Sequence, residues 1–245
     1  MTTEGIGPRI ENYDTFMARF SSFSERELDA LELAYQFPKA AHGKMLQVRL
    51  TGERYFEHPR LAALILVDEC GLNKPEYLPI ICATLLHDVA EDTSLFGNPK
   101  KKRYGEWIED VRRRVAGVFN VFLGDSGSKL LADIEVAVTE PKVDGIDVLT
   151  EEQAIEIKHQ KLIEGPVEGL LVKMSDRLHN LRTFVPKKKE GEKTPEEKIK
   201  ETELILIPIF RRALEKYPKE TEYLLAEIGK AIAALRVKFS LEPVS

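Results

Sequence analysis

Long hydrophobic runs, basic residues in excess and cysteines are all scarce in this sequence of 245 residues. The apolar runs Tyr77–Leu86 and Leu204–Phe210 are too short to span a bilayer, and each contains a proline. The net charge of -5 argues against a general nucleic-acid-binding protein, whose surface would be basic. The first residues contain neither a basic region nor an apolar segment, so no secretory signal is visible. We therefore expect no membrane and no nucleic acid among its partners.

The cysteines and the pattern of apolar residues indicate the cellular compartment and the fold class. The two cysteines, Cys70 and Cys82, lie in apolar stretches that are typical of small core residues. Because disulfides are rare in the reducing cytosol, this usage predicts a cytoplasmic protein. No stretch alternates apolar and polar residues for long, which predicts few strands and an all-α fold. We expect a single domain over residues 1–245, and the sequence leaves the oligomeric state open.

Capping residues and helix breakers predict where the helices begin and end. Ser24 followed by Glu27 is typical of a capping box at a helix start. Pro38 is predicted to interrupt that helix, and Pro59 to be the first residue of the next. Gly124–Gly127 is predicted to break a long helical stretch. We expect the other helices over Ile10–Phe20, Lys39–Arg49, Gly105–Phe122, Lys129–Val138, Glu151–Ile163, Val167–Arg182, Glu196–Glu215 and Lys219–Phe239, with Lys187–Lys198 as a mobile polar loop.

The most distinctive feature is His87-Asp88 followed by Glu91-Asp92. The run Tyr77–Asp92 predicts one helix with an apolar stripe. On such a helix His87 lies one turn from Glu91, and Asp88 one turn from Asp92. Four ionisable groups at the end of a buried helix need partners or a bound cation. We favour a metal site for hydrolysis over the alternative, a solvated helix end with salt bridges.

Two further residues complete a candidate metal site. His58 lies at a loop-to-helix junction, and Asp176 lies in an apolar helical stretch where a carboxylate needs a partner. Together with His87 and Asp88 they provide two imidazoles and two carboxylates from separate helical segments. This mixed nitrogen and oxygen set suits Mn, Fe or Zn, and it leaves positions open for water and a phosphate oxygen. The acidic pair that follows His87-Asp88 would orient or deprotonate that water.

Several longer motifs surround these residues. Gln47–Pro59 reads Q-V-R-L-T-G-E-R-Y-F-E-H-P, His87–Thr93 reads H-D-V-A-E-D-T, and Val172–Thr183 reads V-K-M-S-D-R-L-H-N-L-R-T. In this order they resemble the hydrolase domain of the RelA/SpoT proteins, within the HD-domain metal-dependent phosphohydrolases. Val136–Lys142 and Lys198–Arg212 are similar to the family segments that contain G-V-T-K and E-T-x-x-I-Y-x-P-L-A-x-R. The resemblance covers about residues 30–215 and implies an HD-domain helical bundle, which a C-terminal helix over 219–239 would close.

The resemblance implies a role for each matched residue of the site. It places one Mn²⁺ per chain, with Fe or Zn as alternatives, on the ligand set His58, His87, Asp88 and Asp176. It assigns the handling of the attacking water to the catalytic pair Glu91 and Asp92.

The resemblance also implies a substrate. Arg49 matches the arginine beside the guanine base, and Asn180 and Thr183 match positions that contact the nucleoside. The implied reaction removes the 3′-pyrophosphate from the guanosine nucleotides ppGpp and pppGpp, which yields GDP or GTP and pyrophosphate.

The sequence departs from the family pattern around the nucleotide rather than at the metal. Arg54 replaces a proline, Leu50 and Lys44 stand at positions of a basic residue and a histidine, and Leu206 stands where a tyrosine is frequent. Two alternatives therefore stay open. One is an HD phosphohydrolase for another nucleotide, such as a deoxynucleotide or NADPH. The other is a non-catalytic module that senses a nucleotide, against which the complete metal set and acidic pair argue.

Other polar residues are interpreted as structural. His42, His159 and His179 are expected at the surface or in helix packing, His179 as a support within its motif. The basic run Lys100–Arg103 could clamp a pyrophosphate, but a solvated loop is the commoner meaning of such a run.

Overall fold

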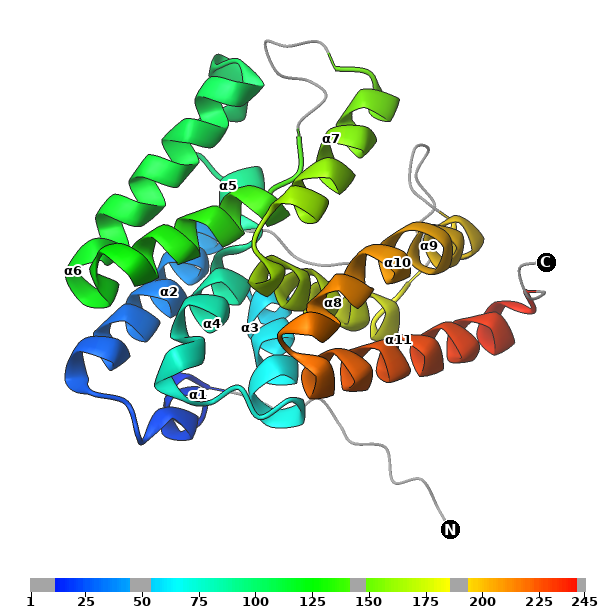
Figure 1. Ribbon diagram of the computed structural model, residues 1–245, viewed down its shortest axis with the longest axis horizontal. Coiled ribbons are helices and arrows are strands. Elements are labelled where there is room, and N and C mark those ends of the chain that lie inside the picture. The colour runs from blue at the N-terminus through cyan, green and yellow to red at the C-terminus, as the bar shows by residue number, and fades with distance from the viewer. Residues whose placement is uncertain (1–11, 45–53, 142–148, 186–193, 242–245) are drawn as a thin grey trace.

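The predicted all-α fold class is confirmed by the structure, a computed structural model that describes residues 12–44, 54–141, 149–185 and 194–241. Among these residues there are helices and connecting segments but no β-strand (Figure 1). The α-helices are α1 (Tyr13–Met17), α2 (Glu25–Lys44), α3 (Glu57–Leu64), α4 (Leu78–Leu86), α5 (Val89–Asp92), α6 (Tyr104–Val138), α7 (Glu151–Glu164), α8 (Val167–Arg182), α9 (Pro195–Glu201), α10 (Ile207–Phe210) and α11 (Pro218–Phe239). Short 3₁₀ or π segments join or extend them: η1 (Ala18–Phe20), η2 (Ile65–Glu69), η3 (Pro75–Tyr77), η4 (Pro99–Lys101), η5 (Thr202–Leu206) and η6 (Arg211–Glu215).

Helix α8 is the centre of the bundle. It contacts α3, α4, α6 and α11, which surround it in Figure 1. All its residues from Glu168 to His179 are buried, including Lys173, Asp176 and Arg177. A helix that is buried on every side must pair its charged side chains within the protein, because an unpaired buried charge is costly. The polar residues of α8 therefore have to face partners on the surrounding helices.

The local capping signals predicted helix starts well. Ser24 donates its backbone N–H to Glu27 (2.7 Å), which confirms the capping box before α2. Helix α8 has the predicted bounds, and α7 begins after a second capping box at Thr150. The prediction for Pro59 was wrong, because α3 already begins at Glu57.

The prediction that Pro38 interrupts the second helix was also wrong. Helix α2 continues through Pro38 to Lys44, although an internal proline removes a hydrogen bond and costs roughly 3 kcal/mol. The fully buried residues Leu31 and Ala34 of α2 pack into the core that α2 shares with α4. Continuous burial of this face compensates for the lost bond, which a local rule does not take into account. The predicted extension to Arg49 lies outside the described residues beyond Lys44.

The predicted break at Gly124 folds the longest helix back on itself. Gly124 has φ +66° and ψ 180°, a left-handed conformation that favours glycine. The two arms of α6 consequently form a hairpin (Figure 1), and an ion pair between Arg112 and Asp133 links them. The second arm ends at Val138, beside α7 and α8. This arrangement brings the end of α6 close to the motif-bearing helices.

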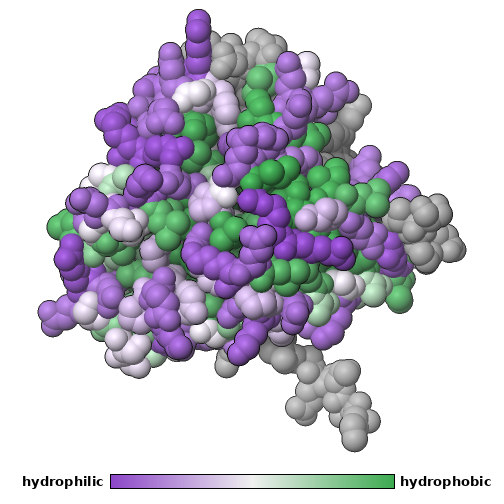
Figure 2. Space-filling view, viewed as in Figure 1, coloured by the Kyte–Doolittle hydropathy of each residue, from purple (hydrophilic) through white to green (hydrophobic). Residues whose placement is uncertain are grey.

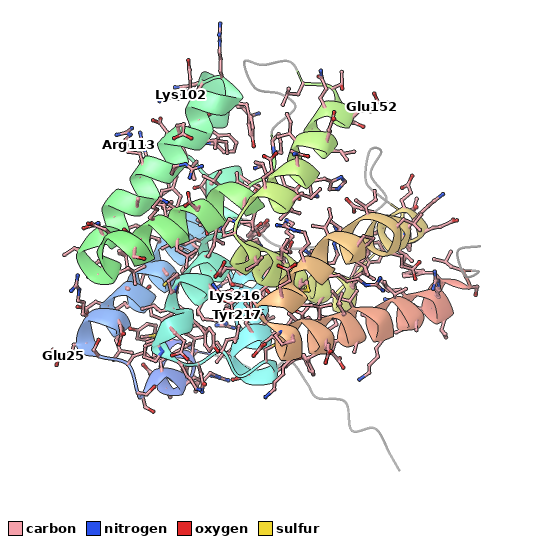
Figure 3. All side chains as sticks on the ribbon, viewed as in Figure 1. Glu25, Lys102, Arg113, Glu152, Lys216 and Tyr217 are labelled. Carbon is pink, nitrogen blue, oxygen red and sulfur yellow. The ribbon has the colours of Figure 1, made fainter. Side chains whose placement is uncertain are left out.

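One face of the molecule is largely hydrophilic, and polar contacts attach the start of the C-terminal helix α11 to α8. Figure 2 shows hydrophilic side chains over much of this face, with hydrophobic patches between them. Tyr217, just before α11, donates its hydroxyl to Glu168 of α8 (3.1 Å), and Lys216 pairs with the same carboxylate (2.5 Å; Figure 3).

Three further sequence predictions concern the cysteines, membrane crossing and the polar loop. Cys70 and Cys82 are free thiols. No described helix combines the length and the apolar character that a membrane crossing needs. Helix α9 begins at Pro195, inside the segment predicted as a loop, whose residues 187–193 lie outside the described part.

Glu135 of α6 should make stability fall as pH rises. Its carboxyl group is fully buried without a hydrogen-bond partner, and burial, together with Asp88 and Glu91, raises its pKa well above the usual value. The folded state therefore binds this proton more tightly than the unfolded state, whose glutamate pKa is about 4.3. Stability from this group is present below pH ~4.3 and is lost as pH rises toward the folded pKa.

The variant that tests this prediction is Glu135→Gln, which cannot ionise and keeps the shape of the side chain. We expect its Tm at pH 8 to exceed that of the wild type by about 3 to 6 °C, equivalent to about 1 to 2 kcal/mol, with little difference at pH 4. Thermal unfolding followed by circular dichroism from pH 4 to 8 measures this. Glu109→Gln, at an exposed position on the same helix, should leave the pH dependence unchanged. An identical pH dependence for Glu135→Gln and wild type would contradict the prediction.

Candidate metal centre

The four predicted metal ligands converge at the junction of α3, α4 and α8. His58 lies in the first turn of α3, and Asp176 lies in the middle of the buried helix α8. His58 Nε2 is 3.1 Å from Asp176 Oδ1 and 3.7 Å from Asp88 Oδ2. His87 Nε2 is 3.1 Å from Asp88 Oδ1 and 3.8 Å from Asp176 Oδ1. Residues that are up to 118 positions apart in the sequence, His58 and Asp176, are thus placed in one cluster.

The helix that was predicted over Tyr77–Asp92 is interrupted at this cluster. Helix α4 ends at Leu86 and α5 begins at Val89, so His87 and Asp88 form the junction. Their backbone stays in the right-handed region, with φ -50° at His87 and -92° at Asp88. The chain tightens into a turn here, and both side chains point to the same cluster as a result.

Hydrogen bonds determine which nitrogen of each imidazole faces the centre. His87 Nδ1 is 2.8 Å from the Thr84 carbonyl oxygen, which can only accept, so Nδ1 carries the proton. His58 Nδ1 is 2.7 Å from Nδ1 of His179, which holds the His58 ring from behind. In both rings Nε2 is left to face the carboxylates, and a partner on the far ring nitrogen is typical of metal-binding histidines. The predicted supporting role of His179 thus has a specific contact.

The local charges favour a cation between these groups. Burial lowers the pKa of His58, against the opposing effect of Asp176, and so favours the neutral ring. Burial would raise the pKa of Asp88, but His87 and His58 outweigh it and hold that pKa below its usual value. Burial of Asp176 is likewise outweighed, chiefly by Lys173, and its pKa lies well below the usual range. A neutral His58 ring and ionised carboxylates at Asp88 and Asp176 are electron-pair donors.

The donor set fits a divalent metal ion. The ligand atoms of His58, His87 and Asp88 lie within 4.8 Å of one another, and Asp176 Oδ1 is beside both imidazoles. His87 Nε2 is buried and has no hydrogen-bond partner, as expected for a lone pair directed at a cation. Ligands about 2.0 to 2.2 Å from a metal ion are separated from one another by roughly 3 to 3.5 Å, which is close to the spacing found here.

The acidic pair lies at the edge of this cluster, and its two members have different partners. Asp92 Oδ2 accepts a hydrogen bond from the Tyr55 hydroxyl (2.6 Å), which is also 3.1 Å from Asp88 Oδ2. Burial, with Asp88 and Asp92, raises the pKa of Tyr55, so this hydroxyl keeps its proton and donates. Glu91 Oε1 accepts the backbone N–H of Glu140 (2.5 Å) at the end of α6. The pair is therefore held from two directions.

The residues predicted to contact the nucleoside have local partners. Asn180 donates its amide to Asp176 Oδ1, and Thr183 donates its hydroxyl to the His179 carbonyl oxygen (2.8 Å). Asn180 is thus next to the predicted metal ligands, and Thr183 is at the end of the same helix. Arg49 lies outside the described residues.

Three residues that contact the cluster or the acidic pair were not predicted from the sequence: Tyr55, Lys173 and Glu140. Tyr55 lies inside the matched motif three residues before His58, and Lys173 lies one helical turn before Asp176, so position alone could have suggested both. Lys173 Nζ is 3.1 Å from Asp176 Oδ2. Glu140 lies in Val136–Lys142, which resembles a family segment, but nothing in that short motif indicates a contact with the acidic pair. His42, expected in packing, stacks on Tyr55 with ring centroids 4.5 Å apart.

The basic run Lys100–Arg103 agrees with a solvated loop rather than with a clamp for pyrophosphate, since one of its lysines pairs with a carboxylate outside the candidate site. Lys102 pairs with Asp110, to which Arg113 also binds (2.9 Å). Lys102, just before α6, and Arg113, in the arm of α6 that precedes Gly124, lie away from the centre of the bundle (Figure 3).

Known proteins similar to this chain carry related names. A guanosine-3′,5′-bis(diphosphate) 3′-pyrophosphohydrolase of Aquifex aeolicus is 31% identical over 200 residues, which are 80% of this chain and 23% of that protein. The bifunctional (p)ppGpp synthase/hydrolase SpoT of Escherichia coli K12 is 28% identical over 163 residues, which are 65% of this chain and 19% of that protein. The chain thus spans about a fifth of the length of these relatives.

Family and structure comparisons complete this picture. No family model matches the chain. A solved structure described as a metazoan ortholog of SpoT that hydrolyzes ppGpp matches with a TM-score of 0.50 and 17% identity, over 90% of this chain and 98% of that one. The match shows a shared fold. The resemblance that the motifs predicted is confirmed, and the chain is a homologue of the RelA/SpoT proteins with the all-α fold of their hydrolase relatives.

Proposed function

We propose that this chain is a metal-dependent hydrolase that removes the 3′-pyrophosphate of guanosine alarmones, ppGpp and pppGpp. The observation that carries the proposal is the convergence of two imidazoles and two carboxylates beside a separate acidic pair. The names of the relatives, which include 3′-pyrophosphohydrolases and a synthase/hydrolase, support the substrate class. The free cysteines and the lack of a membrane-crossing helix among the described residues support action in the cytoplasm.

The ligands of the proposed metal ion are His58, His87, Asp88 and Asp176. We assign Mn²⁺ to this site, with Fe and Zn as alternatives, because the set mixes imidazole nitrogen with carboxylate oxygen. When bound, such an ion polarises a phosphoryl oxygen and lowers the pKa of a nearby water.

The acidic pair carries the proton transfer. A water oxygen attacks the phosphorus attached to the 3′ oxygen, the bond between that phosphorus and the 3′ oxygen breaks, and pyrophosphate leaves. Glu91 or Asp92 accepts the proton that the water loses, and the freed 3′ oxygen gains one. The Glu140 N–H and the Tyr55 hydroxyl hold the two carboxylates in the orientation that this transfer needs. Asn180, beside Asp176, and Thr183 and Arg49 are proposed to contact the nucleoside.

The test is pyrophosphate release from ppGpp by the purified chain. We expect release that requires Mn²⁺, stops with a chelator and returns when Mn²⁺ is added back. Other nucleotides serve as comparison substrates: pppGpp, deoxynucleoside triphosphates and NADPH. Protein with bound Mn²⁺ that leaves both alarmones intact and hydrolyses another nucleotide would overturn the substrate assignment but keep the metal-dependent chemistry.

A further inference from the structure

Residue 140, just beyond the end of α6, connects the acidic pair to the metal ligands. Its backbone N–H donates to Glu91 Oε1 (2.5 Å), as described above. Its side-chain Oε1 is 2.6 Å from Lys158 Nζ of α7 and 3.2 Å from Lys173 Nζ of α8. Lys173 Nζ in turn is 3.1 Å from Asp176 Oδ2. One unbroken series of polar contacts therefore runs from Glu91 through Glu140 and Lys173 to Asp176.

A further lysine, Lys161, binds the backbone at the end of α6, next to residue 140. Lys161 Nζ of α7 donates to the carbonyl oxygens of Val136 (2.9 Å) and Thr139. These carbonyls belong to the last turn of α6, where a cation is favourable because the helix dipole is negative at this end. Burial lowers the pKa of Lys161 to about 8, although the nearby Glu91 opposes the decrease. Lys161 is thus a half-buried lysine that binds the carbonyl oxygens at the end of α6.

Close packing of the backbone keeps these contacts in place. Gly165, which follows α7, lies so near α6 that a Cβ atom there would be 2.6 Å from the Cβ of Ala137. Only glycine allows this approach, which sets α7 and its lysines against the end of α6. After Val138 the backbone leaves the helix at Thr139, with ψ 124°. The Thr139 carbonyl that Lys161 binds belongs to the same peptide group as the Glu140 N–H, so Lys161 and the side-chain contacts of Glu140 together hold this N–H toward Glu91.

We propose that Glu140 is a positioning residue, whose carboxylate is anchored by Lys158 and Lys173 so that its backbone N–H orients Glu91 beside the metal ligands. The inference rests on the proposed function, because it assigns Glu91 to proton transfer. Its physical basis is that a backbone N–H donor both orients a carboxylate and favours its ionised form. Ionised, correctly directed Glu91 is the form that can accept a proton from water.

The effects of substitution differ between a purely structural salt bridge and a positioning residue. Loss of a structural bridge lowers the unfolding temperature and changes kcat and KM together only as far as the fold is damaged. Loss of a positioning contact lowers kcat and leaves KM and metal affinity nearly unchanged, because Glu91 would then be misdirected while the ligand set is intact.

The test variant is Glu140→Gln, which keeps the size and removes the charge that binds the two lysines. With Mn²⁺ and ppGpp we expect kcat to fall about 10- to 100-fold, the range for loss of a supporting contact, while KM and Mn²⁺ affinity change less than about 3-fold. The amide hydrogen of residue 140 should exchange with solvent at least about 10-fold faster by NMR, because this N–H is no longer held toward Glu91 Oε1. Glu203→Gln, which breaks a comparable ion pair with Arg236 on the outside of the bundle (2.7 Å), should change none of these.

A pair of lysine variants separates anchoring from general damage. Lys158→Met should reproduce the kcat loss of Glu140→Gln, and Lys158→Arg, which keeps the cation, should restore most of it. Unchanged amide exchange at residue 140 in Glu140→Gln overturns the inference whichever nucleotide is the substrate, because this readout needs no turnover. Wild-type kcat in Glu140→Gln or Lys158→Met also overturns it. The proposed function is tested independently by pyrophosphate release from the wild type.

Discussion

Asp176→Asn should abolish Mn²⁺-dependent hydrolysis by weakening metal binding at least about 100-fold, more than the loss of a supporting contact would. Asp176 is the carboxylate nearest to His58 Nε2 (3.1 Å), and its other oxygen binds Lys173. Asparagine has the same shape but is neutral, so the site loses an anionic ligand and presents an amide to the cation. Isothermal titration with Mn²⁺, together with pyrophosphate release, measures both effects.

The fold should survive this substitution. Lys173 keeps Glu140 as a partner (3.2 Å), so its buried charge is not left alone. Asp68→Asn is the matched control, since Asp68 is an ion-paired aspartate outside the site, bound to Arg19 (2.6 Å). It should bind Mn²⁺ like the wild type. An Asp176→Asn variant that is folded and binds Mn²⁺ with wild-type affinity would remove Asp176 from the ligand set.

Changing Glu91 and Asp92 together, as Glu91→Gln with Asp92→Asn, should lower kcat about 10²- to 10⁴-fold, the range for loss of a general acid–base group. Both substitutions keep the size of the side chain and remove its ability to take a proton. Neither residue is among the four ligands, so Mn²⁺ affinity should stay within a few-fold of the wild type. Steady-state kinetics on ppGpp, with Mn²⁺ titration of the same protein, gives the comparison.

The same double variant decides between an enzyme and a nucleotide sensor. A sensor would bind ppGpp with turnover that does not depend on this pair, so equal turnover in variant and wild type would favour the non-catalytic alternative. The single variants add detail. Asp92 has the Tyr55 hydroxyl as its partner and Glu91 has the Glu140 N–H, so the variant with the larger kcat loss identifies the residue that accepts the proton.

The contacts behind the ligands explain how a site of this charge is accommodated in a core. His179 fixes the ring of His58, the Thr84 carbonyl fixes that of His87, and Lys173 offsets the charge of Asp176. Each partner comes from a well-packed helix, so the protein itself orients the four proposed ligands. Such support is what separates a metal site from a chance cluster of acidic and imidazole groups.

Local pattern was sufficient for most of the helices and for choosing the four proposed ligands, which the structure brings together in one cluster. The capping box at Ser24, the break at Gly124 and the bounds of α8 depend on residues within a few positions of one another, which is the range over which capping and backbone preferences act. His58, His87, Asp88 and Asp176 could be found because polar residues in apolar, motif-bearing segments need a reason to be there.

Only the tertiary structure decided what stands behind and beside those ligands. A helical pattern tells which face of a helix is buried, but it does not tell which residue of a distant helix lies opposite. The pairing of His58 with His179, and of Glu91 with the N–H of residue 140, depends on how α3, α6 and α8 are packed. Packing also carried α2 through Pro38 and divided the predicted helix at His87-Asp88. These features arise from contacts between segments far apart in the chain, whose energies exceed local propensities.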